Sequence, residues 1–296
     1  MRLVYTENVH ALALPTTHRF PIAKYERIHR ALARDHRPIL MLGAPAAWDD
    51  VRLVHDGAYV ERVRAGALDA GEVRRLGFPW SESLVVRARR SVGGTLAALE
   101  WAVAHGAAGH IAGGTHHAFR DRGEGFCVFN DIATAIAVGR RDHGLQRAAV
   151  VDLDVHQGNG TAAIYAGDPD VFTLSLHGAH NYPFRKESST LDVGLPDGTG
   201  DDAYLRALAP ALERVAAFRP DVVFYQAGVD ALAGDRLGRM SLSQRGLARR
   251  DAAVFALARR LGVPIVVTLG GGYGRDIDAT VEAHVAVYHG LVVAFS

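Results

Sequence analysis

The chain has 296 residues, of which 49% are hydrophobic and 22% are charged. This composition is ordinary for a soluble globular protein, and because α/β proteins of this length often form one domain, we expect one domain over residues 1–296. The formal net charge of +1 gives no reason to expect nucleic acid or an anionic membrane as a partner. No window holds the roughly 18 uninterrupted apolar residues of a membrane span.

The first residues and the cysteine count predict the compartment. The first eight residues lack the apolar stretch of a signal peptide. Cys127 is the single cysteine, which excludes an intrachain disulfide and suits a reducing cytosol. Only Lys24 and Lys186 among the 33 basic residues are lysines, and the many arginines and alanines favour a bacterial source. We therefore expect a cytoplasmic protein, while the sequence carries no signal for an oligomeric state.

Short apolar runs rich in β-branched residues alternate with longer segments of helical period. In chain order the predicted elements are helix Ile22–Ala33, strand Pro38–Leu42, helices Glu82–His105 and Asn130–His143, strands Ala148–Val155 and Val171–Leu176, helix Asp201–Phe218, strand Asp221–Gln226, helix Ser243–Leu261 and strand Pro264–Leu269. This alternation predicts a parallel sheet flanked by helices on both faces. The stretch Gly178–Gly200 is rich in turn residues and is predicted to be a long loop. Functional sites of such sheets lie beyond the carboxyl ends of the strands.

One predicted strand ends in metal-ligand chemistry. Strand alternation would put Asp152, Asp154 and His156 on one side of it. Buried carboxylates are costly unless a cation or dense hydrogen bonding compensates them. Carboxylate and imidazole together suit Zn²⁺, Fe²⁺ or Mn²⁺, and the alternative is a hydrogen-bonded cluster that fixes the loop.

A third candidate ligand follows another apolar strand. Asp230 comes shortly after Gln226, and such an Asp on its own is more often a helix cap or turn residue. Combined with Asp154 and His156 it completes an Asp, His, Asp set with an open position, as a catalytic metal requires.

Two glycine-rich segments carry further candidates. His116 and His117 follow a glycine turn and are interpreted as an acid/base pair, with metal binding or a surface position as alternatives. Three glycines precede Tyr273, whose hydroxyl could donate to an oxyanion. The alternatives there are a packed tyrosine on a flexible turn and a phosphate loop, the latter weak because no Lys-Ser/Thr and no clear helix follow.

A third segment, Gly125–Asp131, places aromatic residues beside a glycine. Phe126 would line a substrate channel or pack in the core. Asn130 is predicted to be a helix N-cap. Cys127 has no obvious cationic neighbour and is predicted to be buried and unreactive.

Taken in order, these segments resemble the histone deacetylase family of the arginase/deacetylase fold. The matching stretches are GGTHHA at 113–118, GFCVFND at 125–131, VDLDVHQGNGT at 151–161, FTLSLH at 172–177, QAGVDALAGD at 226–235 and LGGGYG at 269–274, with VHDGAY at 54–59 upstream. HRFP at 18–21 and GFPW at 77–80 resemble the bacterial and class IV branch.

The resemblance implies a role for each matched residue. Asp154, His156 and Asp230 would bind a catalytic Zn²⁺, with Fe²⁺ as the alternative, which polarises the substrate carbonyl and a water. His117 would be the general base, and His116, oriented by Asp152, its electrostatic partner and a proton donor. Tyr273 would stabilise the oxyanion. The remaining implied sites are a tunnel wall of Gly125, Phe126 and Tyr182 and a K⁺ site of Asp152, Asp154, His156, Ser175 and Leu176.

Two positions depart from the class I pattern. Asn159 stands where class I members carry an Asp, so weaker support of the His117 imidazole is expected. Pro79 stands where class I members carry a rim Asp that grips the peptide backbone. These departures put a histone substrate in question.

The expected activity is a zinc-dependent deacylase acting on N-acyl-lysine in a protein or peptide. The same residues would serve a deacetylase of small acylated amines, such as an acetylpolyamine or an acetoin-linked substrate, or the removal of long acyl chains. An arginase-like di-metal hydrolase would need a second ligand cluster, which the sequence lacks. A non-catalytic acyl-lysine binder is disfavoured because every residue that the chemistry needs is present.

Overall fold

The computed structural model describes residues 1–6, 12–15, 18–34 and 39–296. Its centre is a parallel sheet in the order β2-β1-β3-β8-β7-β4-β5-β6. The strands are β1 (Arg2–Tyr5), β2 (Ile39–Leu42), β3 (Ala107–His110), β4 (Ala148–Asp152), β5 (Val171–Gly178), β6 (Leu191–Leu195), β7 (Val222–Gln226) and β8 (Ile265–Thr268). The predicted fold class, a parallel sheet between helices, is confirmed.

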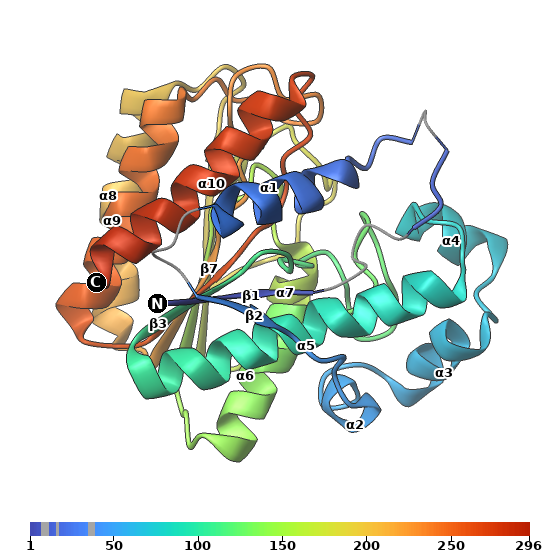
Figure 1. The fold of residues 1–296 in the computed structure, drawn as a ribbon. Helices are drawn as coiled ribbons and strands as arrows, with labels where there is room; N and C mark the ends of the chain where they lie inside the picture. The colour runs from blue at the N-terminus through green and yellow to red at the C-terminus, as the bar shows by residue number, and fades with distance from the viewer. Residues whose placement is uncertain (7–11, 16–17, 35–38) are drawn as a thin grey trace.

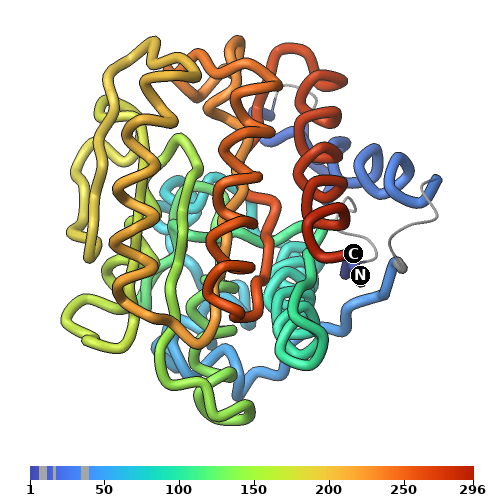
Figure 2. The backbone as a smooth tube through the Cα atoms, turned by 90° about the vertical axis from the view of Figure 1, so that its left-hand side faces the viewer, coloured from blue at the N-terminus to red at the C-terminus, as the bar shows by residue number. Residues whose placement is uncertain are grey.

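Helices cover both faces of this sheet (Figure 1). The helices are α1 (Ala23–Ala33), α2 (Trp48–Val51), α3 (Gly57–Ala65), α4 (Ala70–Leu76), α5 (Glu82–His105), α6 (Asp131–Asp142), α7 (Asn159–Ile164), α8 (Asp201–Phe218), α9 (Gln244–Leu261) and α10 (Ile277–Ala294). Helices α5 and α6 pack together on one face, while α8, α9 and α10 run side by side on the other (Figure 2). No helix of the described residues is long and apolar enough to cross a membrane.

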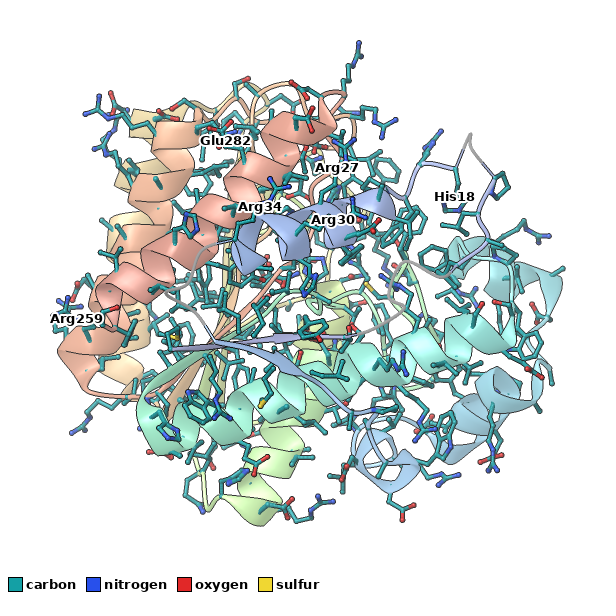
Figure 3. The ribbon with its side chains drawn as sticks, in the orientation of Figure 1. His18, Arg27, Arg30, Arg34, Arg259 and Glu282 are labelled. Atoms are coloured by element: carbon teal, nitrogen blue, oxygen red, sulfur yellow. The ribbon has the colours of Figure 1, made fainter. Side chains whose placement is uncertain are left out.

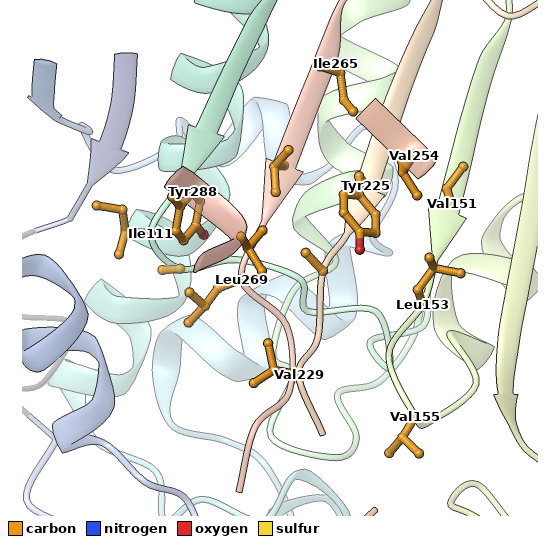
Figure 4. Close-up of a cluster of buried hydrophobic side chains, with 14 of the residues drawn as sticks. Ile111, Val151, Leu153, Val155, Tyr225, Val229, Val254, Ile265, Leu269 and Tyr288 are labelled. Atoms are coloured by element: carbon orange, nitrogen blue, oxygen red, sulfur yellow. The ribbon is translucent and has the colours of Figure 1, made fainter. Parts of the chain in front are cut away.

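The central strands bury apolar side chains on both faces, which is why their sequences show little alternation. Val150 and Phe224 pack toward α5 and α6. Their chain neighbours Val151 and Tyr225 belong to the cluster on the opposite face, which also holds Val254 of α9 (Figure 4). Each such side chain contributes about 1.5–3 kcal/mol through burial, so the strands form a rigid base for the loops at their carboxyl ends.

The predicted elements are present with shifted ends, and several elements were not predicted. Pro38, the predicted start of one strand, lies outside the described residues, and that strand spans Ile39–Leu42. Asn130 caps α6 as predicted, because its side chain accepts from the Ala133 N–H. Strands β1 and β3 are only four residues long, too short for a periodic signal.

Three predictions about local structure were wrong. The stretch Gly178–Gly200 is not only a loop, because it contains the edge strand β6. A helix does follow the glycine-rich segment after β8: α10 begins at Ile277, capped by Asp276. Apolar residues occupy most positions of this helix, including some on its exposed side, so its sequence shows only a weak amphipathic period. The strand predicted to reach Val155 ends at Asp152.

Candidate metal centre and active site

The early end of β4 shapes the site. The Asp152 carboxylate accepts the backbone N–H of Asp154 at 3.1 Å, and the Asp154 carboxylate accepts that of His156 at 3.0 Å. Side chains that bond backbone two residues ahead compete with the sheet ladder and turn the chain. Asp154 and His156 therefore lie in a turned segment beyond the strand, so strand alternation is not the reason that their side chains meet.

Asp154, His156 and Asp230 converge at one point beyond β4 and β7. One ligand atom from each lies within 4.8 Å of the others, and all three residues are buried. The His156 Nδ1 is 3.0 Å from Asp154 Oδ1 and 3.1 Å from Asp230 Oδ2. The backbone fixes both carboxylates, since Gly271 N–H donates to Asp154 at 2.7 Å and Val155 N–H donates to Asp230 at 2.8 Å.

This donor set fits a divalent metal ion. Burial would lower the pKa of His156, but Asp154 and Asp230 outweigh it and raise that pKa to about 10. Burial raises the pKa of Asp230 to about 7, with the Asp154 carboxylate adding to the effect. The site thus attracts positive charge, and one nitrogen with two carboxylate donors suits Zn²⁺ or Fe²⁺. A Cβ on Gly271 would lie 1.9 Å from Asp230 Oδ2, so only glycine leaves room for the ligand there.

The histidine pair lies in a turn beside these ligands. Asp131 at the start of α6 holds this turn by accepting the N–H groups of Gly114 at 2.9 Å and Thr115 at 2.6 Å. The ring centroids of His116 and His117 are 4.1 Å apart, and the His117 ring is 6.0 Å from that of His156. The turn brings both imidazoles to the candidate metal centre, which an extended segment would not do.

The two imidazoles differ in proton affinity. His116 Nδ1 is 2.7 Å from Asp152 Oδ2. Burial would lower the pKa of His116, but Asp152 and Asp154 outweigh it and raise that pKa to about 9. Burial lowers the pKa of His117 well below its ordinary value, and His116 and His156 lower it further. At neutral pH one ring is therefore charged and its neighbour neutral.

Asn159 supports His117 and is itself supported by Glu124, a residue that the sequence did not single out. His117 Nδ1 is 2.6 Å from Asn159 Oδ1. The Asn159 amide donates to Glu124 Oε1 at 3.0 Å, and the Tyr182 hydroxyl donates to the same carboxylate. Because the Asn159 nitrogen faces a carboxylate, its oxygen must face the ring. His117 then carries its proton on Nδ1, which leaves the lone pair on Nε2.

Tyr273 lines the same two cavities as His117. Its ring centroid is 6.4 Å from that of His156, and burial raises the pKa of its hydroxyl well above the ordinary value. Its backbone is fixed by Asp235, which accepts the Tyr273 N–H at 2.6 Å, and by Arg236, which donates to its carbonyl at 2.9 Å. The buried Lys24 donates to the carbonyls of Gly270 at 3.2 Å and Gly272 at 3.3 Å. These two hydrogen bonds hold the glycine segment in place.

A cavity of about 590 Å³ leads from the surface to this site. The predicted wall residues Gly125, Phe126 and Tyr182 all line it, whereas Pro79 is exposed and is not part of the lining. Phe126 has a φ of +67°, a conformation that costs a non-glycine residue about 1–2 kcal/mol. The strain is offset by docking on α4, where the Phe126 N–H donates to the Leu76 carbonyl at 2.9 Å.

A second, smaller cavity of about 40 Å³ is lined by the candidate metal ligands Asp154 and His156. Phe20, Tyr25 and Arg87 line it from the N-terminal side and α5. Both cavities share His117, His156 and Tyr273 in their linings. The two cavities therefore adjoin at the candidate metal centre.

The residues of the predicted cation site lie on β4, β5 and the turn between them. Ser175 is the register partner of Asp152, and its hydroxyl lies 3.0 Å from His177 Nδ1. Arg250 of α9, which the sequence did not single out, is fully buried here. Its guanidinium donates to the carbonyls of Leu153 at 3.3 Å and Gly228 at 2.6 Å, so it joins the two segments that carry the candidate metal ligands.

Comparison with known proteins places the chain among the hydrolases that act on amide bonds. The chain belongs to the histone deacetylase family, since residues 18–288 match the histone deacetylase domain. This family is generally metal-dependent, and the Asp154, His156 and Asp230 cluster is its candidate metal site here.

Particular relatives support this placement. The chain is 42% identical over 280 residues to an uncharacterised protein of Picosynechococcus, covering 92% of each chain. It is 32% identical to histone deacetylase 2 of Arabidopsis thaliana, over 90% of this chain and 72% of the relative. It is 38% identical to a histone deacetylase-like amidohydrolase of Pseudomonas aeruginosa, over 78% of this chain and 65% of the relative.

A solved structure shows the same fold. The acetylpolyamine aminohydrolase from Burkholderia pseudomallei superimposes with a TM-score of 0.83 at 22% identity, and the match covers 98% of both chains. At that identity the likeness concerns the fold alone, which is the arginase/deacetylase fold.

Proposed function

We propose that residues 1–296 form one catalytic domain, a zinc-dependent deacylase that hydrolyses the amide of N-acyl-lysine in a protein or peptide. The observation that carries the proposal is the convergence of Asp154, His156 and Asp230 beside the two cavities that His117 and Tyr273 line. The lone cysteine and the arginine-rich composition support a bacterial cytoplasmic enzyme.

Asp154, His156 and Asp230 would hold Zn²⁺, with Fe²⁺ as the alternative. A bound metal of this kind supplies a Lewis acid for the amide carbonyl and lowers the pKa of water toward about 7. Phe126, Gly125 and Tyr182 would guide the acylated amine to this point, because they wall the cavity that ends there.

His117 would act as the general base. Its Nδ1 proton is engaged by Asn159, so the neutral ring presents Nε2 to take a proton from the attacking water. The same nitrogen then helps to return a proton to the leaving amine. His116, held charged by Asp152, would stabilise the developing negative charge beside it and act as a further proton donor.

Tyr273 would donate its hydroxyl hydrogen to the oxyanion. Burial keeps that hydroxyl protonated, and fixed backbone contacts from Asp235 and Arg236 keep its position. A donor that needs no rearrangement during the reaction is worth about 10²–10³ in rate.

The K⁺ site would use Asp152, Asp154, His156, Ser175 and Leu176, largely through backbone oxygens. Its support is the register that sets Asp152 beside Ser175. Leu153 lies between Asp152 and Asp154 in the chain, and its carbonyl accepts a hydrogen bond from Arg250. That carbonyl would therefore not be a ligand of the cation.

The rival functions make different demands. A small acylated amine, such as an acetylpolyamine, would use the same catalytic residues. An arginase-like di-metal site would need a second cluster, and the described part of the chain holds a single group of three or more metal-ligating side chains. A non-catalytic binder would retain substrate without turnover.

The test is hydrolysis of an acetyl-lysine peptide and an acetylpolyamine by the zinc-loaded protein and by Tyr273→Phe. We expect peptide turnover that falls about 10²–10³-fold in Tyr273→Phe with unchanged zinc content. Tight peptide binding without hydrolysis would favour the non-catalytic binder, and turnover of the acetylpolyamine alone would favour the small-amine enzyme.

A further inference from the structure

The mouth of the outer cavity is strongly basic. Its lining contains five arginines, all exposed, and no aspartate or glutamate among the described residues: Arg19, Arg74, Arg75, Arg236 and Arg239. The net charge of the whole chain is only +1. Positive charge is therefore concentrated where a substrate enters.

These arginines come from separate segments around the opening. Arg19 precedes α1, and Arg74 with Arg75 forms the last turn of α4. Arg236 and Arg239 lie between β7 and α9. A substrate in the cavity would thus meet positive charge from several sides, which a single surface arginine would not provide.

Carboxylates behind the mouth neutralise it only in part. Asp197 lies 3.3 Å from Arg239. Asp69 interacts electrostatically with Arg74 and Arg75, and its carboxylate also caps the first turn of α4. Asp235 is engaged by backbone N–H groups, including that of Tyr273 at 2.6 Å.

Glu124 is a fourth acid close to the mouth. It accepts hydrogen bonds from Asn159 and Tyr182, and Arg122 lies 3.8 Å away. With these four acids set against the five lining arginines and Arg122, the opening keeps a small excess of positive charge.

We infer that the enzyme prefers acylated amines flanked by negatively charged groups, such as an acyl-lysine with Asp or Glu within a few residues. This inference rests on the proposed function. Like-signed walls of a cleft raise the local concentration of oppositely charged substrate. An acetylpolyamine carries ammonium groups beside its acetamide, so the same arginines would repel it.

The first experiment compares kcat/KM for acetyl-lysine peptides that differ only in having Glu, Gln or Lys on both sides, together with an acetylpolyamine. At about 20 mM salt we expect the Glu peptide to exceed the Lys peptide about tenfold. At about 500 mM salt the difference should shrink, because screening shortens the reach of exposed charges. Equal rates for the three peptides, or a faster acetylpolyamine, would overturn the inference, whereas no hydrolysis of any peptide would overturn the proposed function instead.

A matched pair of variants locates the source of the preference. Arg74→Glu with Arg75→Glu reverses charge in the last turn of α4 at the mouth. Arg259→Glu with Arg260→Glu makes the same change in the last turn of α9. Arg259 lies on the opposite side of the molecule from His18, which contacts Gly77 just beyond α4 (Figure 3).

The mouth variant should reduce the Glu-over-Lys preference to about threefold or less, while the α9 variant keeps the full preference. Circular dichroism establishes that both variants fold. A folded mouth variant with an undiminished preference would overturn the inference, and so would an equal loss in the α9 variant.

Discussion

Asn159 donates its side-chain N–H to Glu124 at 3.0 Å while its oxygen lies 2.6 Å from His117 Nδ1. The amide thus transmits the influence of a carboxylate to the imidazole, although it carries no charge itself. An asparagine in this position was expected to support the ring weakly, and the Glu124 contact offsets that weakness.

Removing the Glu124 charge should slow catalysis without removing the metal. In Glu124→Gln the charged carboxylate becomes a neutral amide that can either accept from Asn159 or donate to it, so the Asn159 orientation is no longer fixed, and we expect kcat to fall about tenfold with little change in KM. Tyr182→Phe, which removes the other donor to Glu124 but leaves Asn159 in place, should cost less. Steady-state kinetics and zinc content of both variants measure this.

A double-mutant cycle tests the direction of the contact. Asn159→Asp alone sets two carboxylates about 3 Å apart, and their repulsion should impair activity. Adding Glu124→Gln supplies an amide donor to the new acid, so the double variant should exceed the product of the single effects. Strict additivity would contradict a direct contact between these two positions.

The volume of the smaller cavity predicts the length of the acyl group that the enzyme removes. At about 40 Å³ it has room for about three water-sized groups. An acetyl group fits, whereas a long acyl chain would have to displace packed side chains. We expect kcat/KM for a dodecanoyl-lysine peptide to lie about 100-fold or more below that for the acetyl-lysine peptide. Phe20→Ala, which enlarges this cavity, should narrow the gap.

Arg250 should be essential to stability although it lies outside the cavities. Arg250→Met would leave the Asp251 carboxylate, 2.8 Å from the guanidinium, buried without its partner. It would also leave the Leu153 and Gly228 carbonyls without this donor. Breaking such a buried pair costs about 3–5 kcal/mol of unfolding free energy.

The neighbouring residue provides the control for that prediction. Arg249 is exposed and lies 3.5 Å from Asp202, so Arg249→Met should cost under about 1 kcal/mol. Urea unfolding of both variants gives the comparison. Similar free energies for the two would mean that the buried guanidinium is not holding the ligand segments together.

Buried His55 should make the folded state sensitive to mild acid. Burial lowers its pKa from 6.5 to about 4, and its Nε2 accepts the Asn130 N–H at 2.9 Å. Between pH 6.5 and 4, His55 binds a proton in the unfolded chain but stays neutral in the folded chain. The free energy of unfolding should therefore fall as the pH drops from 6.5 to 4, by about 3 kcal/mol at most for this residue.

The quantity to measure for His55 is the slope of unfolding free energy against pH. A substitution at a buried position also changes the unfolding free energy by the same amount at every pH, and the slope is free of that change. His55→Gln in the metal-free protein should flatten the dependence of unfolding free energy on pH between 6.5 and 4. His143→Gln, at a histidine after α6 that is only partly buried, should leave the slope as in the unaltered chain. A slope unchanged in His55→Gln would contradict the assignment.

The sequence predicted the meeting of Asp154, His156 and Asp230 because parallel strands end at one edge of a sheet. It did not predict Glu124 or Arg250, since each acts through partners distant in the chain, such as Asn159 and Leu153. It also placed the end of β4 too late. The Asp152 and Asp154 carboxylates bond the following backbone and break the ladder, a contact that residue alternation does not reveal.

The missed elements have similar physical causes. Helix α10 packs against α1, α9 and β3, but apolar residues such as Val293 also lie on its exposed side, so its amphipathic stripe is weak. Strand β6 alternates exposed and partly buried residues at the sheet edge. It contains a glycine and an aspartate, which are uncommon in strands, so its sequence is typical of a loop. Both depend on tertiary packing.

The most direct test of the account is a zinc titration of the chelated protein, following hydrolysis of an acetyl-lysine peptide. We predict no turnover without metal, a linear rise on adding zinc, and a plateau at one zinc per chain. A plateau at two zinc ions per chain, or turnover that survives chelation, would contradict a single catalytic metal held by Asp154, His156 and Asp230.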